Sequence, residues 1–506
     1  MPVLPDRAPR LIGLLAAAAM TAYCVHVFAD NKADVDLWGN VGFVTAMPWS
    51  DDYAYENTYA YTVPDHAWIN HEWLAQWVFH KTFAACGNTG LLALKTLMGL
   101  GLAAILWRAV RRHCTSGALA FLYLLLTVST LGYGFSTRPH LFTYLLLAGL
   151  LTLLRTGARP RPAVAAGCAV AAVLWVNLHG AFFIGIVVLL LYGLARLLPA
   201  RAPEGLRAAG IPLGAACGFF GLSFLNPYGP RLWSFVFESG GTMRPYLSEW
   251  APFHPLRHAA IHPDFVVLAA VSAAAVALSR ARRDPAWLAL LAAALAGAFL
   301  MRRNIPLFAI VAAFVVPRHL DGRAGRVVDG LAARVRPAAL AVLLALFAAG
   351  SVAAWALFNK TDPLQIEIPA EKYPLETMAF IEARELSGNA IVFFDWAEYA
   401  IWHLYPRCRV FMDGRFLSAY SPRTVKDYFA FLYGGPGWRR ALDAYDTDMA
   451  LLHRGNPAAD RMAALPGWRL AHTAGPAVLY LRRDRFEALP EGAGDSGSPA
   501  GDAVFP

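Results

Sequence analysis

Charged residues are scarce in this 506-residue sequence, at 16% of the chain, whereas 57% of its residues are hydrophobic. Soluble globular proteins carry about 25% charged residues, so this shortage excludes an ordinary soluble fold for most of the chain. The apolar residues recur in long stretches that predict a mostly α, polytopic bundle of about eleven transmembrane helices. The expected spans cover residues 11–29, 88–107, 117–134, 140–154, 162–179, 181–198, 209–225, 264–280, 285–300, 304–316 and 338–358.

Cysteine is also sparse, and the six cysteines form no CxxC pair and no Cys/His ligand spacing. Their pattern excludes a disulfide framework, a zinc site and a thiol redox motif. A bridge between Cys86 and Cys408 stays open only if both residues lie outside the cytoplasm. The sequence also has no Walker motif for nucleotide phosphates.

Arginines account for most of the formal net charge of +9, which raises the question of a nucleic-acid partner. About nineteen of them fall in short segments between apolar stretches, rather than on one face or one helix. This arrangement is typical of topology determinants, so no nucleic-acid partner is expected. If the N-terminus is cytoplasmic, the inner segments are all arginine-rich: 7–10, 108–112, 155–161, 196–207, 280–283 and 318–336.

The resulting orientation predicts a multi-pass protein of the inner (plasma) membrane with a cytoplasmic N-terminus. We expect a transmembrane domain over residues 1–358, with an outer loop at 30–87, and an extracytoplasmic domain over 359–488. The tail at 489–506 is rich in Gly, Ser, Pro and Ala and is expected to be disordered. The first apolar stretch is interpreted as a retained signal anchor because its run is nearly twenty residues; a cleaved signal is the alternative.

The expected C-terminal domain has four apolar runs that predict strands, at residues 390–394, 409–412, 449–452 and 477–481. A helix-like segment, Glu398–Tyr405, lies between the first two runs, so a small α/β domain is predicted. Asp395, Asp413-Gly414-Arg415 and Asp448 fall at strand ends, where sites of α/β folds collect. Loop and cap roles are the favoured interpretation for these residues.

Two carboxylates, Asp34 and Asp36, follow the first apolar stretch directly, in the sequence Ala33-Asp34-Val35-Asp36-Leu37-Trp38. Carboxylates beside a bilayer are costly, so the pair is a candidate functional site. The same outer loop carries His71 and Glu72 at the start of a predicted surface helix, which Asn70 can cap. A role for Glu72 in favouring the helix dipole is an equally weighted alternative.

The other outer segments hold polar residues that hydropathy does not explain. Arg138, Arg302 and Arg303 oppose the positive-inside pattern, and arginine can grip phosphate through its planar fork. Contact with lipid headgroups or with acidic side chains is the alternative for them. The candidate substrate-binding residues are His71, Glu72, Arg138, His140, Asn177, His179, Tyr228, Glu249, Arg302 and Arg303.

Together these motifs resemble the GT-C superfamily of membrane glycosyltransferases, and most closely a set of largely uncharacterised bacterial GT-C-like proteins. The resemblance covers nearly the whole chain. Its motifs are Asp-Val-Asp-Leu-Trp from Asp34, Asn-His-Glu-Trp-Leu from Asn70, Arg-Pro-His-Leu-Phe from Arg138, Asn-Leu-His-Gly from Asn177, Asn-Pro-Tyr-Gly from Asn226, Ser-Glu-Trp from Ser248 and Arg-Asn-Ile-Pro from Arg303.

The resemblance implies transfer of a sugar from a polyprenyl-phosphate carrier to a glycan, lipid or protein acceptor on the outer face of the membrane. It implies that Asp36 or Asp34 is the base that activates the acceptor, with Asp36 the first choice. Asp34 either orients Asp36, binds a cation or is structural. A divalent cation, Mg²⁺ or Mn²⁺, would need further oxygen ligands such as Glu56, Glu72 or the substrate phosphate.

Two other functions stay open. A transporter or flippase of lipid-linked glycan would also place polar residues near span ends, but it predicts polar groups through the bilayer and a repeat between halves. The spans here are mostly apolar, and no clear repeat is visible. A non-catalytic partner in envelope polysaccharide assembly would tolerate neutralisation of both Asp34 and Asp36.

Overall fold

The computed structural model describes residues 7–46, 57–62, 68–156, 162–197, 202–241, 246–320, 322–359, 362–487 and 503–505. The chain divides into two compact units, each assembled from separate segments. The first unit comprises Met1–Asp30, Leu92–Gly229 and Met243–Pro363. The second comprises Asn31–Leu91, Pro230–Thr242 and Leu364–Pro506. The outer loop is therefore grouped with the C-terminal segment, which composition alone had assigned to a separate domain.

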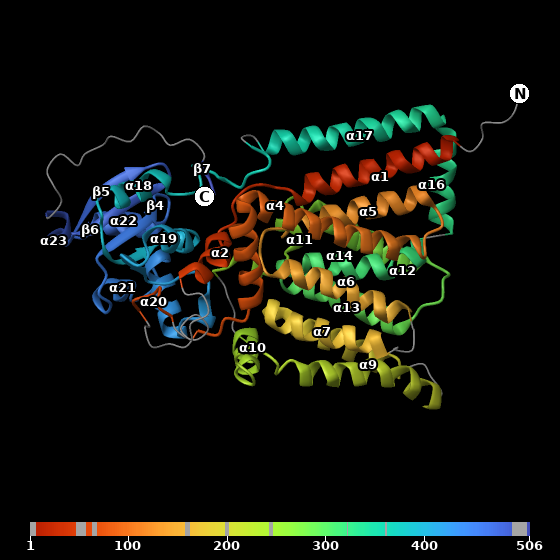
Figure 1. The fold of residues 1–506 in the computed structure, drawn as a ribbon, viewed down its shortest axis with the longest axis horizontal. Coiled ribbons are helices and arrows are strands. Elements are labelled where there is room, and N and C mark those ends of the chain that lie inside the picture. Colours follow the sequence, from red (N-terminus) through yellow and green to blue (C-terminus); the bar gives the residue numbers. More distant parts are fainter. Residues whose placement is uncertain are drawn as a thin grey trace, which may run out of the picture. The chain divides into compact units, whose positions relative to one another are not determined.

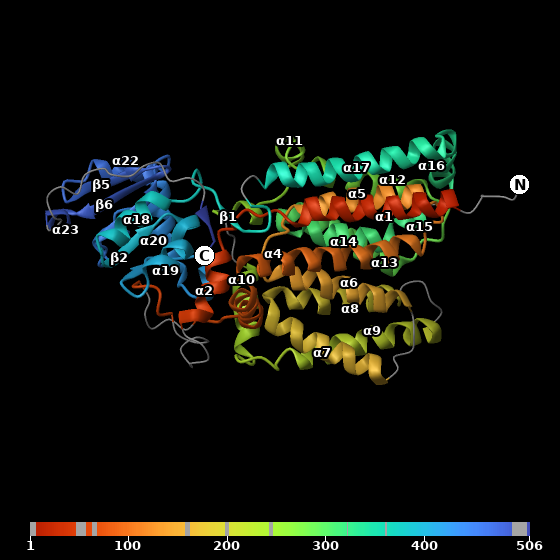
Figure 2. The same cartoon turned by 45° about the horizontal axis from the view of Figure 1, so that its top comes forward.

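The first unit is a helical bundle, in which Figures 1 and 2 show helices such as α1, α5 and α17 running side by side. Its helices are α1 (Arg7–Phe28), the second part of α4 (Trp73–Arg111), α5 (Gly117–Gly132), α6 (His140–Thr156), α7 (Pro162–Leu178), η1 (Gly180–Phe182), α8 (Phe183–Ala195), α9 (Ala202–Leu222), η2 (Ser248–Trp250), α11 (Pro255–His258), α12 (Pro263–Leu278), α13 (Pro285–Leu300), η3 (Arg302–Asn304), α14 (Ile305–Val315), α15 (Pro317–Leu320), α16 (Arg323–Arg334) and α17 (Pro337–Phe358).

Helix α14 forms the centre of this unit. Ten of its eleven residues are buried, and it packs against α5, α6, α12 and α13. Its sequence, Ile-Pro-Leu-Phe-Ala-Ile-Val-Ala-Ala-Phe-Val, is apolar on every side, which is the pattern of a helix enclosed by other helices. Pro306, in the first turn, costs no internal hydrogen bond there.

Helices α1 and α17 pack together and are apolar but largely exposed, with Val342, Leu343 and Leu346 each more than half accessible. At 1.5 Å per residue, the 22 residues of α17 extend about 33 Å, which matches a hydrocarbon core of about 30 Å. Such a surface is unfavourable in water but suited to lipid. Among the described residues, three helices are long and apolar enough to span a membrane: α1, α4 and α17.

The remaining apolar helices are shorter, at 10 to 17 apolar residues each. Every expected span is nevertheless helical over most of its length, so the polytopic helical bundle is confirmed. The segment at 73–78 is helical, as predicted, and belongs to the first of two helices that meet within α4 at Gly87. The φ of 62° and ψ of −160° at Gly87 are accessible mainly to glycine.

The second unit is built around a five-stranded sheet of order β3-β2-β4-β6-β5. Its elements are α2 (Leu37–Ala46), the first part of α4, α10 (Arg231–Gly241), β1 (Glu367–Ile368), α18 (Leu375–Ala383), β2 (Gly388–Val392), η4 (Phe394–Trp396), α19 (Ala397–Leu404), β3 (Cys408–Val410), η5 (Phe416–Ser418), α20 (Pro422–Tyr433), α21 (Arg440–Asp443), β4 (Met449–His453), α22 (Pro457–Ala463), β5 (Trp468–Ala474), β6 (Ala477–Arg482), α23 (Arg483–Glu487) and β7 (Ala503–Val504).

The four predicted strands correspond to β2, β3, β4 and β6, and the predicted helix to α19, so the α/β prediction is confirmed. Strand β2 pairs in parallel with β3 and β4, whereas β6 pairs antiparallel with β4 and β5. Strand β5 was not predicted because its residues alternate between buried and exposed without an apolar run. Cys408 and Cys86 are both free, so no bridge joins them.

Outer-loop segments are joined to the sheet by backbone pairing within this unit. Ala60 bridges Val410 at the β3 edge, with Tyr61 donating its N–H to the Val410 carbonyl. Lys32 bridges Glu367, and their side chains form an ion pair. These contacts explain why residues of the outer loop and the C-terminal segment form one compact unit.

The expected disorder of the tail is wrong for Ala503–Phe505. Ala503 and Val504 form β7, which pairs antiparallel with β1. Phe505 is 1% exposed, and its ring lies 5.2 Å from Phe83 and 5.3 Å from Trp402. Composition predicted disorder because it averages over the tail, whereas one large aromatic side chain and two backbone pairs order its end. The rest of the expected disordered segment lies outside the described residues.

We predict that Phe505→Ala destabilises the protein by about 3–5 kcal/mol, because it leaves a cavity among aromatic rings. The measurement is the thermal unfolding midpoint of the purified chain in detergent. Val504→Ala is the control, since Val504 is 39% exposed and its truncation should change little. Equal midpoints for the two variants would show that the tail does not contribute to the fold.

Candidate functional site

Asp34 and Asp36 lie at the start of α2, in the second unit, and both are half-buried. The Asp34 carboxylate accepts the Asp36 backbone N–H at 3.1 Å, and the Asp34 carbonyl accepts the Leu37 N–H at 3.0 Å. Asp34 therefore caps the helix locally, as short acidic side chains commonly do. Of its three open roles, the observed contacts match orientation of the segment that carries Asp36.

A third carboxylate from the C-terminal segment meets this helix start. Glu398, in the first turn of α19, is 6% exposed and accepts the Gly39 N–H through Oε2 at 3.0 Å. Gly39 belongs to the first turn of α2, whose N–H groups lack partners within the helix. Glu398 thus binds the positive end of α2 from another element of the unit.

Gly414 separates the carboxyl groups of Glu398 and Asp36. A Cβ atom at Gly414 would lie 2.5 Å from Glu398 Oε1 and 3.2 Å from Asp36 Oδ1. Both carboxyl groups therefore pack directly against Gly414. Gly414 itself is exposed, whereas Glu398 is buried. A side chain at 414 would collide with the Glu398 carboxyl group.

The charges around Glu398 favour its protonated form. Burial, followed by the negative charges of Asp36 and Asp413, raises the pKa of Glu398 well above its ordinary value. Arg415 and the Gly39 N–H oppose this shift without reversing it. A proton on Glu398 removes one negative charge beside Asp36, which is expected where carboxyl groups lie close together.

Asp413 and Arg415 form a buried ion pair beneath this group. The Asp413 carboxylate accepts Arg415 Nε at 2.9 Å, Arg415 Nη2 at 2.7 Å and the Tyr420 hydroxyl at 2.6 Å. The side chains of Asp413 and Arg415 are 0% and 4% exposed. Buried ion pairs need hydrogen bonds of this kind to offset desolvation, so this pair supports the local structure rather than chemistry. The prediction of a loop role for residues 413–415 agrees with this. Arg415 Nη1 is buried without a hydrogen-bond partner.

His71 and Glu72 lie in the turn before α4, not on one helix as predicted. Glu72 Oε1 lies 3.6 Å from His71 Nε2, and the His71 ring lies 4.8 Å from Phe235 of α10. The Asn70 side chain accepts the Glu72 N–H at 3.3 Å, in the turn before α4 rather than within its first turn. The described contacts of His71 and Glu72 belong to the second unit.

The predicted arginines belong to the first unit, where two of them share one acidic partner. Glu249 lies 3.6 Å from Arg138 Nη1 and 3.8 Å from Arg303 Nη1. The Arg303 guanidinium also stacks 4.3 Å from the Trp250 ring. Glu249 is 40% exposed at its side chain, so this group is accessible.

Arg302 completes the same group. Its backbone N–H donates to the Ala251 carbonyl at 3.1 Å, and its Nη2 donates to the Ser248 carbonyl. The segment containing Glu249 is thereby held beside η3. Three arginines face one glutamate, so the described residues of this group carry an excess of positive charge.

His140 and His179 lie near this end of the first unit, with ring centroids 6.4 Å apart. His179 Nδ1 is 2.8 Å from Thr143 Oγ1, which also accepts the Trp175 indole N–H at 2.8 Å. His140 Nε2 is 2.5 Å from the Gly134 carbonyl. The two predicted histidines are therefore brought together, and each ring is oriented by a hydrogen bond.

Asn177 and Tyr228 have structural contacts. The Asn177 amide donates to Val173 and Leu225 carbonyls at 2.8 and 2.9 Å, joining α7 to the end of α9. Tyr228 is buried and donates its N–H to the Asn226 side chain at 2.8 Å. The segment 226–229 is thus a turn after α9, as its Asn-Pro-Tyr-Gly sequence favours.

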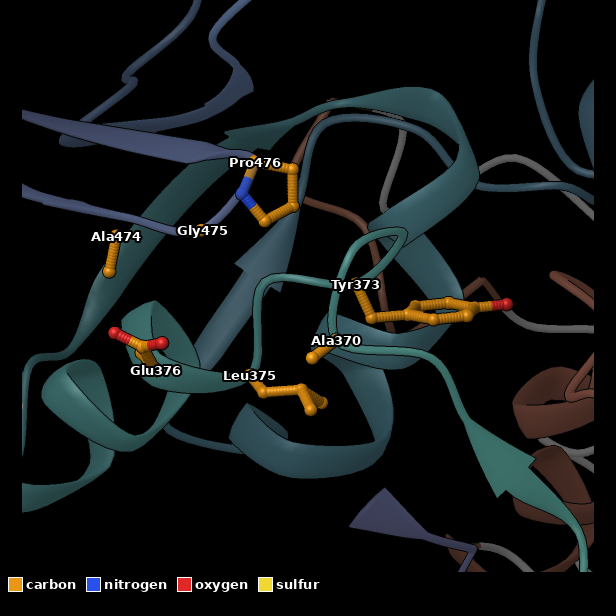
Figure 3. Close-up of a pocket in the computed structure, with 7 residues that line it drawn as sticks. All are labelled: Ala370, Tyr373, Leu375, Glu376, Ala474, Gly475 and Pro476. Atoms are coloured by element: carbon orange, nitrogen blue, oxygen red, sulfur yellow. The ribbon is translucent and has the colours of Figure 1, made fainter. Parts of the chain in front are cut away.

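A hollow in the second unit lies between the loop before α18 and the turn joining β5 to β6 (Figure 3). It is lined by Ala370, Tyr373, Leu375, Glu376, Ala474, Gly475 and Pro476. Its volume of 10 Å³ accommodates about one water molecule, so it is too small for a sugar. In the described part of the chain, no three His, Cys, Asp or Glu side chains are arranged to hold a metal ion. Glu56, a predicted additional ligand, lies outside that part.

Apolar helices packed around α14, combined with a small mixed α/β domain, define a mostly helical, multi-span membrane protein. A similar fold is found in ArnT. The structure of ArnT from Cupriavidus metallidurans bound to undecaprenyl phosphate matches with a TM-score of 0.50 at 13% identity, over 93% of this chain and 97% of that one. Its apo structure matches with the same TM-score at 14% identity, over 94% and 98%. No protein-family profile and no curated protein matches the sequence.

We predict that Glu398→Gln makes stability less dependent on pH. Because the pKa of Glu398 is raised in the folded protein, the protonated side chain stabilises the folded state fully below the ordinary glutamate pKa. This stability is lost as the pH rises towards the raised pKa, by about 1.4 kcal/mol for each pH unit. Gln keeps an oxygen for the Gly39 N–H but cannot ionise. The unfolding midpoint of the variant should therefore rise relative to the wild type as the pH increases above the ordinary glutamate pKa of about 4.3.

The control is Glu371→Gln, because Glu371 is exposed. Its midpoint should follow the wild type at every pH. A midpoint difference between Glu398→Gln and the wild type that stays constant with pH would contradict a protonated Glu398.

Proposed function

We propose that this protein is a glycosyltransferase that moves a sugar from a polyprenyl-phosphate carrier to a hydroxyl acceptor at the extracytoplasmic face of the inner membrane. The similarity to ArnT over 93% of the chain supports the fold on which this proposal rests. The observation that carries the chemistry is the convergence of the Asp36 and Glu398 carboxyl groups on exposed Gly414. The C-terminal domain would lie outside the cytoplasm.

In this mechanism the acceptor hydroxyl attacks the anomeric carbon of the donor sugar, and the bond from that carbon to the phosphate oxygen breaks. Asp36 takes the hydroxyl proton, and the polyprenyl phosphate leaves with the bonding electrons. A carboxylate can act as general base when it is correctly placed and its proton affinity is raised by its surroundings. Asp34 keeps the helix start in place, as its bond to the Asp36 N–H supports.

Glu398 contributes by remaining protonated. A neutral Glu398 leaves Asp36 as the single charged carboxylate of the pair, so Asp36 is free to accept the acceptor proton. The bond from Gly39 to Glu398 holds the first turn of α2, on which the position of Asp36 depends. Glu398 is therefore a positioning residue, and it acts through α2.

The arginines of the first unit are a second, separate candidate site, for the phosphate group of a polyprenyl phosphate. Arg138 and Arg303 both approach Glu249, and guanidinium groups pair with phosphate oxygens through two parallel hydrogen bonds. A divalent cation, bound by Asp34 or Asp36 together with substrate oxygens, is an additional part of the proposal.

We predict that Asp36→Asn lowers sugar transfer by about 10²–10⁴-fold, because an amide cannot take the acceptor proton. The assay uses purified protein, lipid-linked sugars extracted from the native host as donors, and host membranes as the source of acceptor. Transfer of labelled sugar is measured beside the unfolding midpoint. Asp34→Asn is the matched control: its amide oxygen can still accept the Asp36 N–H, so most activity should remain.

Wild-type transfer by a normally folded Asp36→Asn protein would remove Asp36 as the base. Movement of intact lipid-linked sugar across proteoliposomes, without bond cleavage, would instead favour a transporter. Activity that survives chelation unchanged would remove the cation from the proposal.

We also predict that Arg303→Gln weakens binding of polyprenyl phosphate by about tenfold, through loss of a charge-assisted pair. Binding is measured directly with purified protein, so the result does not depend on the acceptor. The control is Arg257→Gln, an exposed arginine of the same unit. Equal loss in both variants would point to nonspecific attraction of the lipid by net charge.

A further inference from the structure

The end of the first unit opposite to Arg138 has its own concentration of positive charge. Arg138 lies before α6, and Arg155 lies in the last turn of that helix. Near Arg155, the ends of α4, α8 and α14 contribute further cationic or titratable side chains. These are Arg112, His113, Arg196, Arg283, Arg318 and His319. Among the described residues, Asp284 is the acidic neighbour, and it already pairs with Arg196 at 3.0 Å.

Arg155 is held firmly, yet part of its hydrogen-bonding capacity is unused. Its Nε donates to His113 Nε2 at 2.8 Å, and its guanidinium carbon lies 4.7 Å from the Trp287 ring. Its Nη1 and Nη2 atoms are buried and have no hydrogen-bond partner. Buried N–H groups nearly always have an acceptor, so an unpaired guanidinium fork at this place indicates a missing one.

His113 accounts for the orientation of this fork. Burial, followed by the charges of Arg155, Arg318 and Arg112, lowers the pKa of His113 to about 4. The ring is therefore neutral near pH 7, and its Nε2 can accept the Arg155 N–H. His113 and Trp287 fix the position of the guanidinium, and Nη1 and Nη2 are the atoms left for a further acceptor.

His319 adds a second unpaired group to the same charged region. It is 5% exposed, and its Nδ1 is buried without a hydrogen-bond partner. Burial and the charges of Arg318, Arg283 and Arg155 lower the pKa of His319. Two buried, unpaired polar side chains thus belong to a region where the described residues carry uncompensated positive charge.

We propose that the Arg155 cluster, comprising Arg112, His113, Arg155, Arg318 and His319, binds the phosphate group of an anionic membrane lipid. Phosphate supplies two oxygens to a guanidinium fork and the negative charge that the cluster lacks. A neutral sugar would not balance the charge, and a metal cation would be repelled.

A lipid is the favoured source of the phosphate because the cluster lies at the ends of apolar helices. Helices α1 and α17 of the same unit expose the apolar surface that a bilayer covers. Helix ends in a bilayer reach the headgroup region, where basic groups between helices bind phosphate. The site is separate from the proposed donor site, which lies at the other end of α6.

The test uses the full-length purified chain in detergent and compares phosphatidylglycerol with diacylglycerol, which has the same acyl chains but no phosphate. Binding is followed by native mass spectrometry and by the unfolding midpoint. We expect phosphatidylglycerol to bind and to raise the midpoint, and diacylglycerol to do neither. Equal binding of the two lipids would overturn the proposal and leave water as the partner of the fork.

Arg155→Lys keeps the charge but loses the fork, and should weaken phosphatidylglycerol binding by about tenfold. Arg112→Gln changes an exposed residue, so it should fold normally and weaken binding several-fold. Arg334→Gln, on exposed α16 outside the cluster, should leave binding unchanged. Unchanged binding by both cluster variants would overturn the proposal.

The last comparison of the experiment uses inorganic phosphate in place of the lipid. If it raises the midpoint as much as phosphatidylglycerol does, and Arg155→Lys removes the effect, the same site is assigned to free phosphate. Because every readout is binding or unfolding, failure of this proposal leaves the proposed sugar transfer unaffected. Failure of the transfer assay likewise leaves the Arg155 cluster as proposed.

Discussion

The second unit depends on the burial of one guanidinium group. The Arg415 side chain is bonded to Asp413 from its own loop and to Asn57 from the outer loop at 2.8 Å. It also lies 4.7 Å from the Phe43 ring and 4.6 Å from the Trp68 ring. Aromatic faces attract a cation more strongly when water is excluded. One side chain thus joins three separate stretches of the outer loop to the loop that follows β3, and the position of α2 and Asp36 follows from it.

Sequence reasoning was most successful where one physical property dominates a whole segment. Lipid-facing and enclosed helices are recognised by apolar length, so the expected spans and strands β2, β4 and β6 were found. The sequence was least informative where the structure of a residue depends on one contact with a residue far away in the sequence. Glu398 looked like an ordinary helix residue, because its partner Gly39 is 359 positions away along the chain. The ordered position of Phe505 was missed for the same reason, since its neighbours Phe83 and Trp402 are far from it in sequence.

The candidate site, too, was predicted from the sequence only in part. Asp34 and Asp36 stood out because charge beside an apolar stretch is unusual, and their half-buried place at a helix start agrees with that signal. Asp413-Gly414-Arg415 was recognised as a strand-end segment, but its role needed the structure. The ion pair supports the loop, and the missing Cβ of Gly414 lets two carboxyl groups pack against its backbone. A glycine flanked by charged residues after a short apolar run is the signal that could have drawn attention to this position.

The pairing of β7 with β1 has a consequence for biosynthesis. The second unit needs residues 31–91 and also the last residues of the chain. At roughly 5–20 residues per second, the early segment waits for tens of seconds before its partners leave the ribosome. Most helices of the first unit are made in that interval. Trp38 and Trp68, which end almost fully buried, are therefore left without their final neighbours while synthesis continues. A chaperone that shields aromatic surface outside the membrane would act on this nascent segment, and truncation of the last few residues would prolong that dependence.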